Sequence, residues 1–351
     1  MIQRVERIDD KLRLLSKPGL LCVDSVLIGK EDALILAAGF EDRVFGVLER
    51  MASSGGGGFK VIILNYKPFL EENKLNAISD FCQKLGVSTH VLTYDRRNPE
   101  GIGEEIMPLL KSVQGNIFID VSAMSRLLIV QILVNLGKHG KFSKTEVLYS
   151  EARVYPPSKD EVETVNKEEK GDTFYRQMFL SFGVYREVTI VPELSSVVLQ
   201  GQPIRLVTFP SFNVDQLTSL QGEIQPYYYN FIHGIPPLPE NAWRPDAIKQ
   251  LNHIDSIPRS KVKETSTSTL DYRETLDYLL KVYADHGAIE RIVIAPIGSK
   301  MQTVAVGIFR TFMDDVHIVY PTPRKFSSPE KYTKGVKDIY QVSLDTFAAI
   351  V

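Results

Sequence analysis

Short apolar runs alternate with segments of helical periodicity along most of the chain. In the first half we expect strands at residues 33–38, 60–66, 87–94, 116–121 and 146–149. Helices are expected between them, at residues 41–51, 71–85, 104–113 and 125–138. Continuous apolar strands that alternate with helices are typical of a parallel sheet covered on both faces. This part of the chain is therefore predicted to be a Rossmann-like α/β unit.

The same alternation resumes further along the chain. It predicts strands at residues 204–209, 225–232, 291–295 and 316–320, and helices at 215–221, 272–286 and 301–313. Residues 158–172 are charged and poor in apolar side chains, which indicates a linker, and residues 236–270 are irregular. We therefore divide the chain into an N-terminal Rossmann-like half at 1–157, a charged linker with a candidate hairpin at 158–200, and a C-terminal Rossmann-like half at 201–351.

Short patterns occur in both halves and in the same order. Ser125–Arg126 and Ser299–Lys300 each open an apolar helix that follows an apolar strand. Residues 149–155 and 320–326 share a tyrosine, an arginine and an aromatic residue at equal spacing. An internal duplication that gives two halves in tandem, related by pseudo-two-fold symmetry, accounts for these matches. The alternative is a general likeness between the strand ends of any two such units.

Loops at the carboxyl ends of parallel strands are where such sheets bind ligands. A helix N-terminus adds free N–H groups and a partial positive charge there, and a basic side chain adds a full charge. The candidate binding residues for a nucleotide-like anionic ligand are Gly39, Ser122, Ser125, Arg126, Arg153, Gly298, Ser299, Lys300 and Arg324. A plainer interpretation stays open, in which the serines cap helices and the basic side chains are solvated.

Two carboxylates are candidates for acid or base chemistry beside these loops. Asp120 ends a strand and suits a general base or a partner for a ribose hydroxyl, but equally a carboxylate bonded to its own loop. Glu41 begins a helix after Gly39, a place where the helix dipole favours a carboxylate in any case. The pattern does not separate these roles.

Composition narrows the class of protein. The formal net charge of -2 argues against a protein that coats a nucleic-acid backbone. The 2 cysteines and 6 histidines show no metal-ligand spacing, and no phosphate-binding P-loop motif occurs, so we expect neither a metal nor a cofactor. The charged residues from Met1 to Lys17 do not form a signal peptide, and no apolar run approaches the roughly 20 residues of a membrane-spanning helix. We therefore expect a cytoplasmic protein without a membrane partner.

The two strand-to-helix loops resemble those of the CRISPR-associated Rossmann-fold (CARF) sensors and their fused two-copy, SAVED-like relatives in bacterial antiphage defence. In that family a small-residue loop that ends in Thr-Lys or a similar pair binds cyclic oligonucleotides at a two-fold axis. Here residues 122–126 and 298–300 would take that place. The chain departs from the family in lacking threonine in both loops and in having Ala123 and Met124 where glycines are expected.

Three functions are consistent with these patterns. The first is a sensor subunit that binds a nucleotide or cyclic oligonucleotide between Arg126 and Lys300 and acts on an effector or partner protein. The second is an enzyme that acts on a nucleotide or nucleoside, as a transferase, glycosidase or phosphodiesterase. The third is a non-catalytic assembly subunit of a multiprotein complex, for which the Pro-rich segment at residues 236–245 is a candidate contact.

Overall fold

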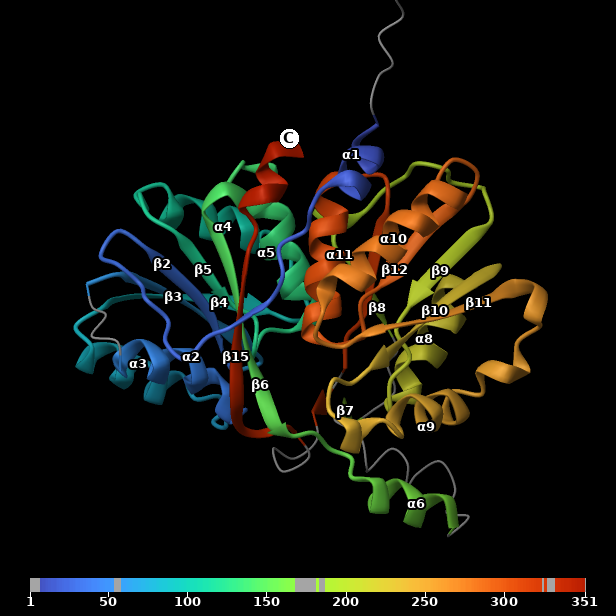
Figure 1. The fold of residues 1–351 in the computed structure, drawn as a ribbon, viewed down its shortest axis with the longest axis horizontal. Helices are drawn as coiled ribbons and strands as arrows, with labels where there is room; N and C mark the ends of the chain where they lie inside the picture. The colour runs from blue at the N-terminus through green and yellow to red at the C-terminus, as the bar shows by residue number, and fades with distance from the viewer. Residues whose placement is uncertain are drawn as a thin grey trace, which may run out of the picture.

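The computed structural model describes residues 7–53, 58–167, 181–182, 187–323, 325–326 and 332–350. In that part of the chain, two mixed sheets of mostly parallel strands stand side by side, and helices alternate with the strands (Figure 1). The predicted α/β class is therefore confirmed.

The first sheet has the strand order β1-β15-β6-β5-β2-β3-β4. Strands β2 to β6 run parallel, whereas β15 pairs antiparallel with β6, and β1 antiparallel with β15. The strand bounds are β1 Leu21–Cys22, β2 Ala33–Ala38, β3 Lys60–Lys67, β4 Ser88–Asp95, β5 Ile117–Asp120, β6 Thr145–Val154 and β15 Lys334–Ser343.

Helices cover both faces of this sheet. Successive residues of a strand point to opposite faces, so Leu34 and Leu36 of β2 join one apolar cluster and Ile35 and Ala37 join another. The first cluster includes side chains of α2 and α3, and the second includes side chains of α4 and α5. The helical bounds are η1 Asp42–Phe45, α2 Gly46–Ser53, α3 Leu75–Lys84, α4 Ile102–Leu110 and α5 Arg126–Lys138.

The second sheet has the strand order β11-β10-β9-β12-β13-β8, and β8 is its antiparallel member. The strand bounds are β8 Val188–Ile190, β9 Ile204–Thr208, β10 Tyr228–Ile235, β11 Val262–Ser268, β12 Arg291–Ala295 and β13 His317–Pro321. The helices are α8 Val214–Ile224, α9 Arg244–Leu251, α10 Tyr272–His286 and α11 Lys300–Phe312.

Strand order is the same in both sheets when each is followed from its outer edge. The series β4-β3-β2-β5-β6 corresponds to β11-β10-β9-β12-β13, and an antiparallel strand follows in each case. Each of these two antiparallel strands joins the sheet of a different region from the one to which we assigned it by sequence. The strand β8 comes from the linker region and joins the second sheet, whereas β15 comes from the C-terminal region and joins the first.

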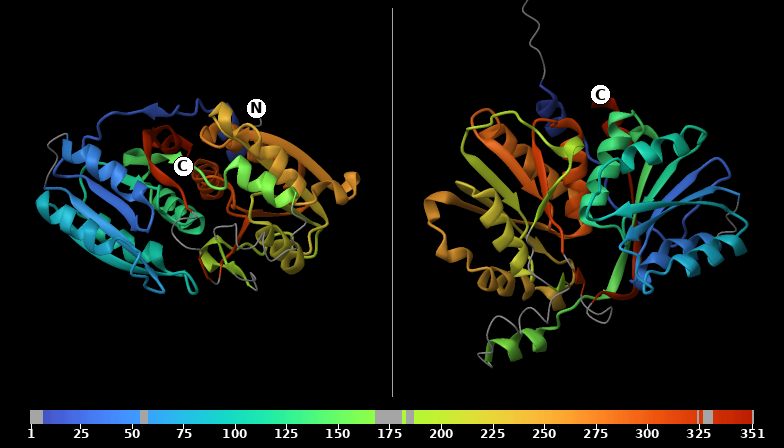
Figure 2. Two further views of the ribbon diagram at one scale, coloured as in Figure 1. Left: turned by 90° about the horizontal axis from the view of Figure 1, so that it is seen from below. Right: turned by 180° about the vertical axis from the view of Figure 1, so that it is seen from behind.

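The candidate linker and the irregular region contain regular elements that the sequence pattern missed. The charged segment forms helix α6 (Lys159–Lys167), and residues 236–270 contain α9 and β11. The candidate hairpin was expected from residues 184–191 and 196–199, of which residues 184–186 lie outside the described residues. The described residues do not form it, because β8 pairs with β13 and residues 196–199 form no strand. Helix α1 (Ile8–Leu14) contacts η8 (Asp345–Ile350) at the end of the molecule opposite α6 (Figure 2).

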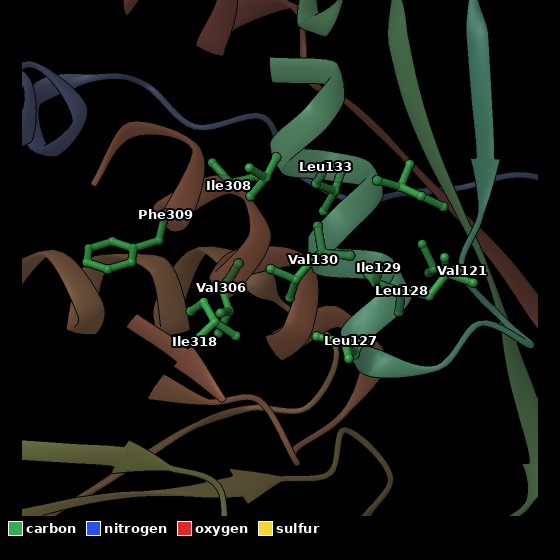
Figure 3. Close-up of a cluster of buried hydrophobic side chains, with 14 of the residues drawn as sticks. Val121, Leu127, Leu128, Ile129, Val130, Leu133, Val306, Ile308, Phe309 and Ile318 are labelled. Carbon is green, nitrogen blue, oxygen red and sulfur yellow. The ribbon is translucent and has the colours of Figure 1, made fainter. Parts of the chain in front are cut away.

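The two sheets share one apolar core, which is formed largely by α5 and α11. Both helices are buried on most sides, and their side chains belong to a single cluster (Figure 3). Leu127, Val130 and Leu133 come from α5, and Val306 and Ile308 come from α11. The N-termini of these two helices are therefore held at fixed places relative to each other. No helix among the described residues is long and apolar enough to cross a membrane.

Candidate functional site

A cavity of about 400 Å³ lies between the two sheets at their carboxyl ends. Its walls are the loops that follow β2, β5 and β6 of the first sheet and β9, β12 and β13 of the second. This is the place where open parallel sheets bind ligands. Of the residues that we predicted for the site, the lining includes Gly39, Glu41, Ser125, Arg126, Gly298, Ser299 and Lys300.

Arg126 and Lys300 cross over each other between the two halves. The Nε of Arg126 donates a hydrogen bond to the carbonyl oxygen of Gly298, and the Nζ of Lys300 donates one to the carbonyl oxygen of Met124. Both side chains are partly buried. We call these two contacts the crossed hydrogen bonds. They bring the two predicted basic side chains into one cavity and tie each loop to the opposite half.

Ser125 and Ser299 cap the two helices. The Oγ of Ser125 accepts the N–H of Leu128 at 3.3 Å, and the Oγ of Ser299 accepts the N–H of Gln302 at 3.1 Å. The side chain of Gln302 in turn accepts the N–H of Ser299, which completes a capping box. Capping satisfies the third N–H of each helix but leaves the first two without an intrahelical acceptor. Two positive helix ends therefore border the cavity.

Cationic side chains outnumber carboxylates in the lining. Of the described residues that line the cavity, the carboxylates are Glu41 and Glu151, whereas the cations are Arg43, Arg96, Arg126, Arg244 and Lys300. Arg43 is 3% exposed and pairs with Glu41 at 2.5 Å. The pKa of Arg43 is raised, because this pairing outweighs the effect of its burial.

Arg96 is a cation of the site that the sequence pattern did not identify. Its guanidinium carbon lies 4.1 Å from the ring centre of Tyr66, a cation–π contact. The hydroxyl of Tyr66 accepts the N–H of Ser125 at 2.5 Å and so connects this arginine to the N-terminus of α5. Arg96 follows β4, the outer strand of the first sheet, and reaches the cavity from that side.

Burial, together with the neighbouring positive charges, lowers the pKa of Lys300 to about 7. Burial is the largest cause, and repulsion by Arg126, Arg43 and Arg96 adds to it, whereas Glu41 opposes it. Burial and the nearby cations both disfavour the charged form of Lys300. An anion placed there would relieve the repulsion.

Asp120 and Ser122 lie behind the cavity wall and are not part of its described lining. Asp120 is 1% exposed and accepts hydrogen bonds from the N–H and the hydroxyl of Ser122. The Oγ of Ser122 also accepts the N–H of Ser150 at 2.7 Å. Burial raises the pKa of Asp120 to about 6. The structure thus places both residues in a buried network that holds β5 against β6.

The two arginines predicted from the tyrosine–arginine pattern are not brought together. Arg153 is exposed and donates a hydrogen bond to the carbonyl oxygen of Val336 at 3.3 Å, outside the described cavity lining. Arg324 lies outside the described residues. Aromatic neighbours from the same pattern do reach the cavity, since Tyr149, Tyr155 and Tyr320 are part of its lining.

A segment that leaves the first half lines the cavity with residues 155–157 and contacts the second half. We call residues 155–163 the strap; it runs from the end of β6 into α6 (Figure 1). Arg244 of α9 donates hydrogen bonds to three successive carbonyl oxygens of the strap, those of Tyr155, Pro156 and Pro157, at 2.9 to 3.0 Å. Its guanidinium also lies over the ring of Phe212.

No family model matches the chain, and no curated protein is significantly similar to it. Among the described residues there is also no group of three or more His, Cys, Asp or Glu side chains that could hold a metal ion. The cavity itself is therefore the feature from which we infer a function.

Proposed function

We propose that this chain is a sensor subunit that binds a nucleotide-like anionic ligand in the cavity between its two halves. The observation that supports this proposal most directly is the meeting of Arg126 and Lys300 in one cavity, each at the N-terminus of its helix. Helix N-termini that carry basic side chains are a common way to bind phosphate.

Several features favour a nucleotide over a bare anion. The volume of about 400 Å³ is within the range of roughly 300–1,000 Å³ that small-molecule sites occupy. The lining also includes aromatic side chains, among them Phe40, Tyr66, Phe212 and Tyr332. Aromatic rings offer stacking surfaces for a base.

A tandem arrangement with pseudo-two-fold symmetry is part of the proposal. The crossed hydrogen bonds are reciprocal, because Met124 and Gly298 each directly precede the serine that caps the helix. Leu133 and Gly307 occupy the same position in their helices, counted from those serines, and they contact each other. Such like-with-like contacts are expected close to a two-fold axis.

Signalling would follow from competition for the crossed hydrogen bonds. A bound anion offers charged acceptors to Arg126 and Lys300, which now donate to neutral carbonyl oxygens. Binding would therefore weaken the crossed hydrogen bonds between the two loops and change the relative orientation of the two halves. The resemblance to CARF sensors suggests that a partner protein in bacterial defence responds to this change.

Charge-removing substitutions test the proposal. Arg126→Gln and Lys300→Gln keep a donor for the carbonyl oxygen but remove the positive charge, and Arg153→Gln is the matched control outside the cavity. Calorimetric titrations would use nucleoside mono-, di- and triphosphates and cyclic di- and oligonucleotides. We expect each site variant to bind at least about tenfold more weakly than the control, the usual loss when a charged hydrogen bond is removed. Wild-type affinity in both site variants, or no binding by any compound, would refute the proposal.

A further inference from the structure

The two walls of the cavity differ in charge, although they come from corresponding parts of the two sheets. Directly after its central first strand, the first half contributes Glu41 and Arg43, whereas the second half contributes Ser211 and Asn213. Directly after the outer parallel strands β4 and β11, the corresponding residues are Arg96 and Thr269. At these places, charged side chains of the first half correspond to neutral ones in the second.

The second half contributes two cations to the described lining, Arg244 and Lys300, but they do not form a cluster that matches the one in the first half. Lys300 crosses to the carbonyl oxygen of Met124 and interacts there with Arg126, Arg43, Arg96 and Glu41, so it joins the charged cluster of the first half. Arg244 keeps its charge on the side of the second half, where it donates to three carbonyl oxygens of the strap. Four of the five cations in the described lining, Arg43, Arg96, Arg126 and Lys300, thus lie toward the first half, where Glu41 pairs with Arg43. The other carboxylate of the described lining, Glu151, also belongs to the first half, and Arg244 is the cation of the opposite side.

The opposite side of the described lining is mostly apolar, with Arg244 as its cation and a few neutral polar groups. The second half contributes mostly proline and aliphatic side chains, and it adds hydroxyl and amide groups. The apolar residues are Pro210, Phe212, Pro236, Pro237, Leu238, Ile248, Leu270 and Ile297, and the neutral polar ones include Ser211, Asn213, Gln216, Asn241 and Thr269. Such a surface suits an uncharged, flat group with hydrogen-bonding edges, such as a nucleobase.

We infer that the ligand is a linear mononucleotide, bound in one orientation and as one molecule per chain. Its phosphate end lies on Arg96, Arg126 and Lys300, and its base lies among Leu238, Ile248 and Leu270. A symmetric cyclic oligonucleotide would place a phosphate against each wall, and the second wall offers no corresponding cations among its described residues at the places of Arg43 and Arg96. This inference rests on the proposed nucleotide-binding function.

The two ends of the ligand are tested with separate probes. Calorimetric titrations of the full chain would use the 5′-monophosphates of adenosine, guanosine, cytidine and uridine, the four free nucleosides, inorganic phosphate, and the cyclic dinucleotides of adenosine and guanosine. We expect at least one monophosphate to bind with a stoichiometry of one, and at least about tenfold more tightly than its nucleoside or either cyclic dinucleotide.

Two variants assign the orientation. Arg96→Thr copies the residue at the corresponding place in the second half, and it should weaken binding of the monophosphate while leaving that of the nucleoside unchanged. Leu238→Ala should weaken binding of the monophosphate and the nucleoside by the same factor and leave binding of inorganic phosphate unchanged. The melting temperature of each unliganded variant checks that it is folded.

The outcomes separate this inference from the function on which it rests. Tighter binding of a cyclic dinucleotide than of every monophosphate would overturn the inference of an asymmetric ligand and leave the proposed function standing. The same holds if Arg96→Thr weakens the nucleoside and the monophosphate equally. Failure of every nucleotide probe to bind would overturn both.

Discussion

Leu133 of α5 and Gly307 of α11 lie opposite each other where the two halves meet. A Cβ atom on Gly307 would lie 2.6 Å from Cδ1 of Leu133, closer than non-bonded carbon atoms approach. The absence of a side chain at Gly307 therefore lets the two helices come together and sets the positions of their N-termini at the cavity. A small residue facing a large one is a usual solution for tightly packed helices.

Substitution of Gly307 by alanine is expected to destabilise the protein. The added methyl group overpacks the contact with Leu133, at a cost of about 1–3 kcal/mol in the free energy of unfolding, which exceeds the gain of up to about 1 kcal/mol in helix propensity. Denaturant unfolding measures the change. Gly222→Ala in α8 is the control, because a Cβ there meets nothing within 4 Å, and it should leave the protein equally or more stable.

A double substitution shows whether Leu133 is the cause. Leu133→Ala removes a buried side chain and is destabilising alone, by about 2–5 kcal/mol. In Leu133→Ala/Gly307→Ala the new methyl group has room, so the loss should be smaller than the sum of the two single losses. If the loss in the free energy of unfolding of the double variant equals the sum of the two single losses, the contact between these two residues does not limit the approach of the helices.

Lys300 makes stability depend on pH in the neutral to alkaline range. Its pKa falls from 10.5 to about 7 on folding, so between these values the unfolded chain binds more protons than the folded one. The free energy of unfolding should therefore rise with pH from about 7 upward, by at most about 1.4 kcal/mol per pH unit. Lys300→Met keeps most of the aliphatic stem and should lose this rise. Equal pH profiles of the two proteins from pH 7 to 9 would contradict the shift.

The buried network of Asp120 and Ser122 is expected to serve stability and not binding. Ser122→Ala leaves the N–H of Ser150 without its acceptor and should lower the free energy of unfolding by about 1–3 kcal/mol. Asp120→Asn keeps an acceptor for the N–H of Ser122. Both variants should bind nucleotides with wild-type affinity when measured well below their melting temperatures. Loss of nucleotide turnover in Asp120→Asn would instead favour the enzyme hypothesis.

The sequence predicts those helices and strands that are buried strongly enough to leave a clear pattern of apolar residues. The strand β2 is buried along its length and α5 on most sides, so both are visible as apolar runs. The strand β11 (VKETSTS) is an outer strand with mostly polar residues and a single buried position, and no alternation identifies it. Nor does a local pattern show that β15 joins the first sheet, because its partner β6 is distant in the chain.

The candidate site was predictable to the extent that it depends on local structure. Ser125 and Ser299 each precede an apolar helix. A search for a basic residue at the start of such a helix therefore identifies Arg126 and Lys300. Arg96 was missed because its place in the cavity depends on stacking over Tyr66, a contact set by packing. Arg153 fits the repeated pattern, but its side chain bonds to β15, a strand that the pattern did not predict.

The strap depends on Arg244, and its exchange with solvent is expected to show this. A guanidinium can donate to three carbonyl oxygens at once, whereas a lysine lacks its planar array of donors, so Arg244→Lys should loosen the strap almost as much as Arg244→Ala. At about 1 kcal/mol for each hydrogen bond, the three contacts are worth about 3 kcal/mol. Hydrogen–deuterium exchange of residues 155–163 should therefore become up to about a hundredfold faster. Arg259→Ala, at an exposed arginine outside the described cavity lining, is the control. Unchanged exchange in both Arg244 variants would show that the packing of Val162 against the cluster that includes Phe212 and Trp243 holds the strap by itself.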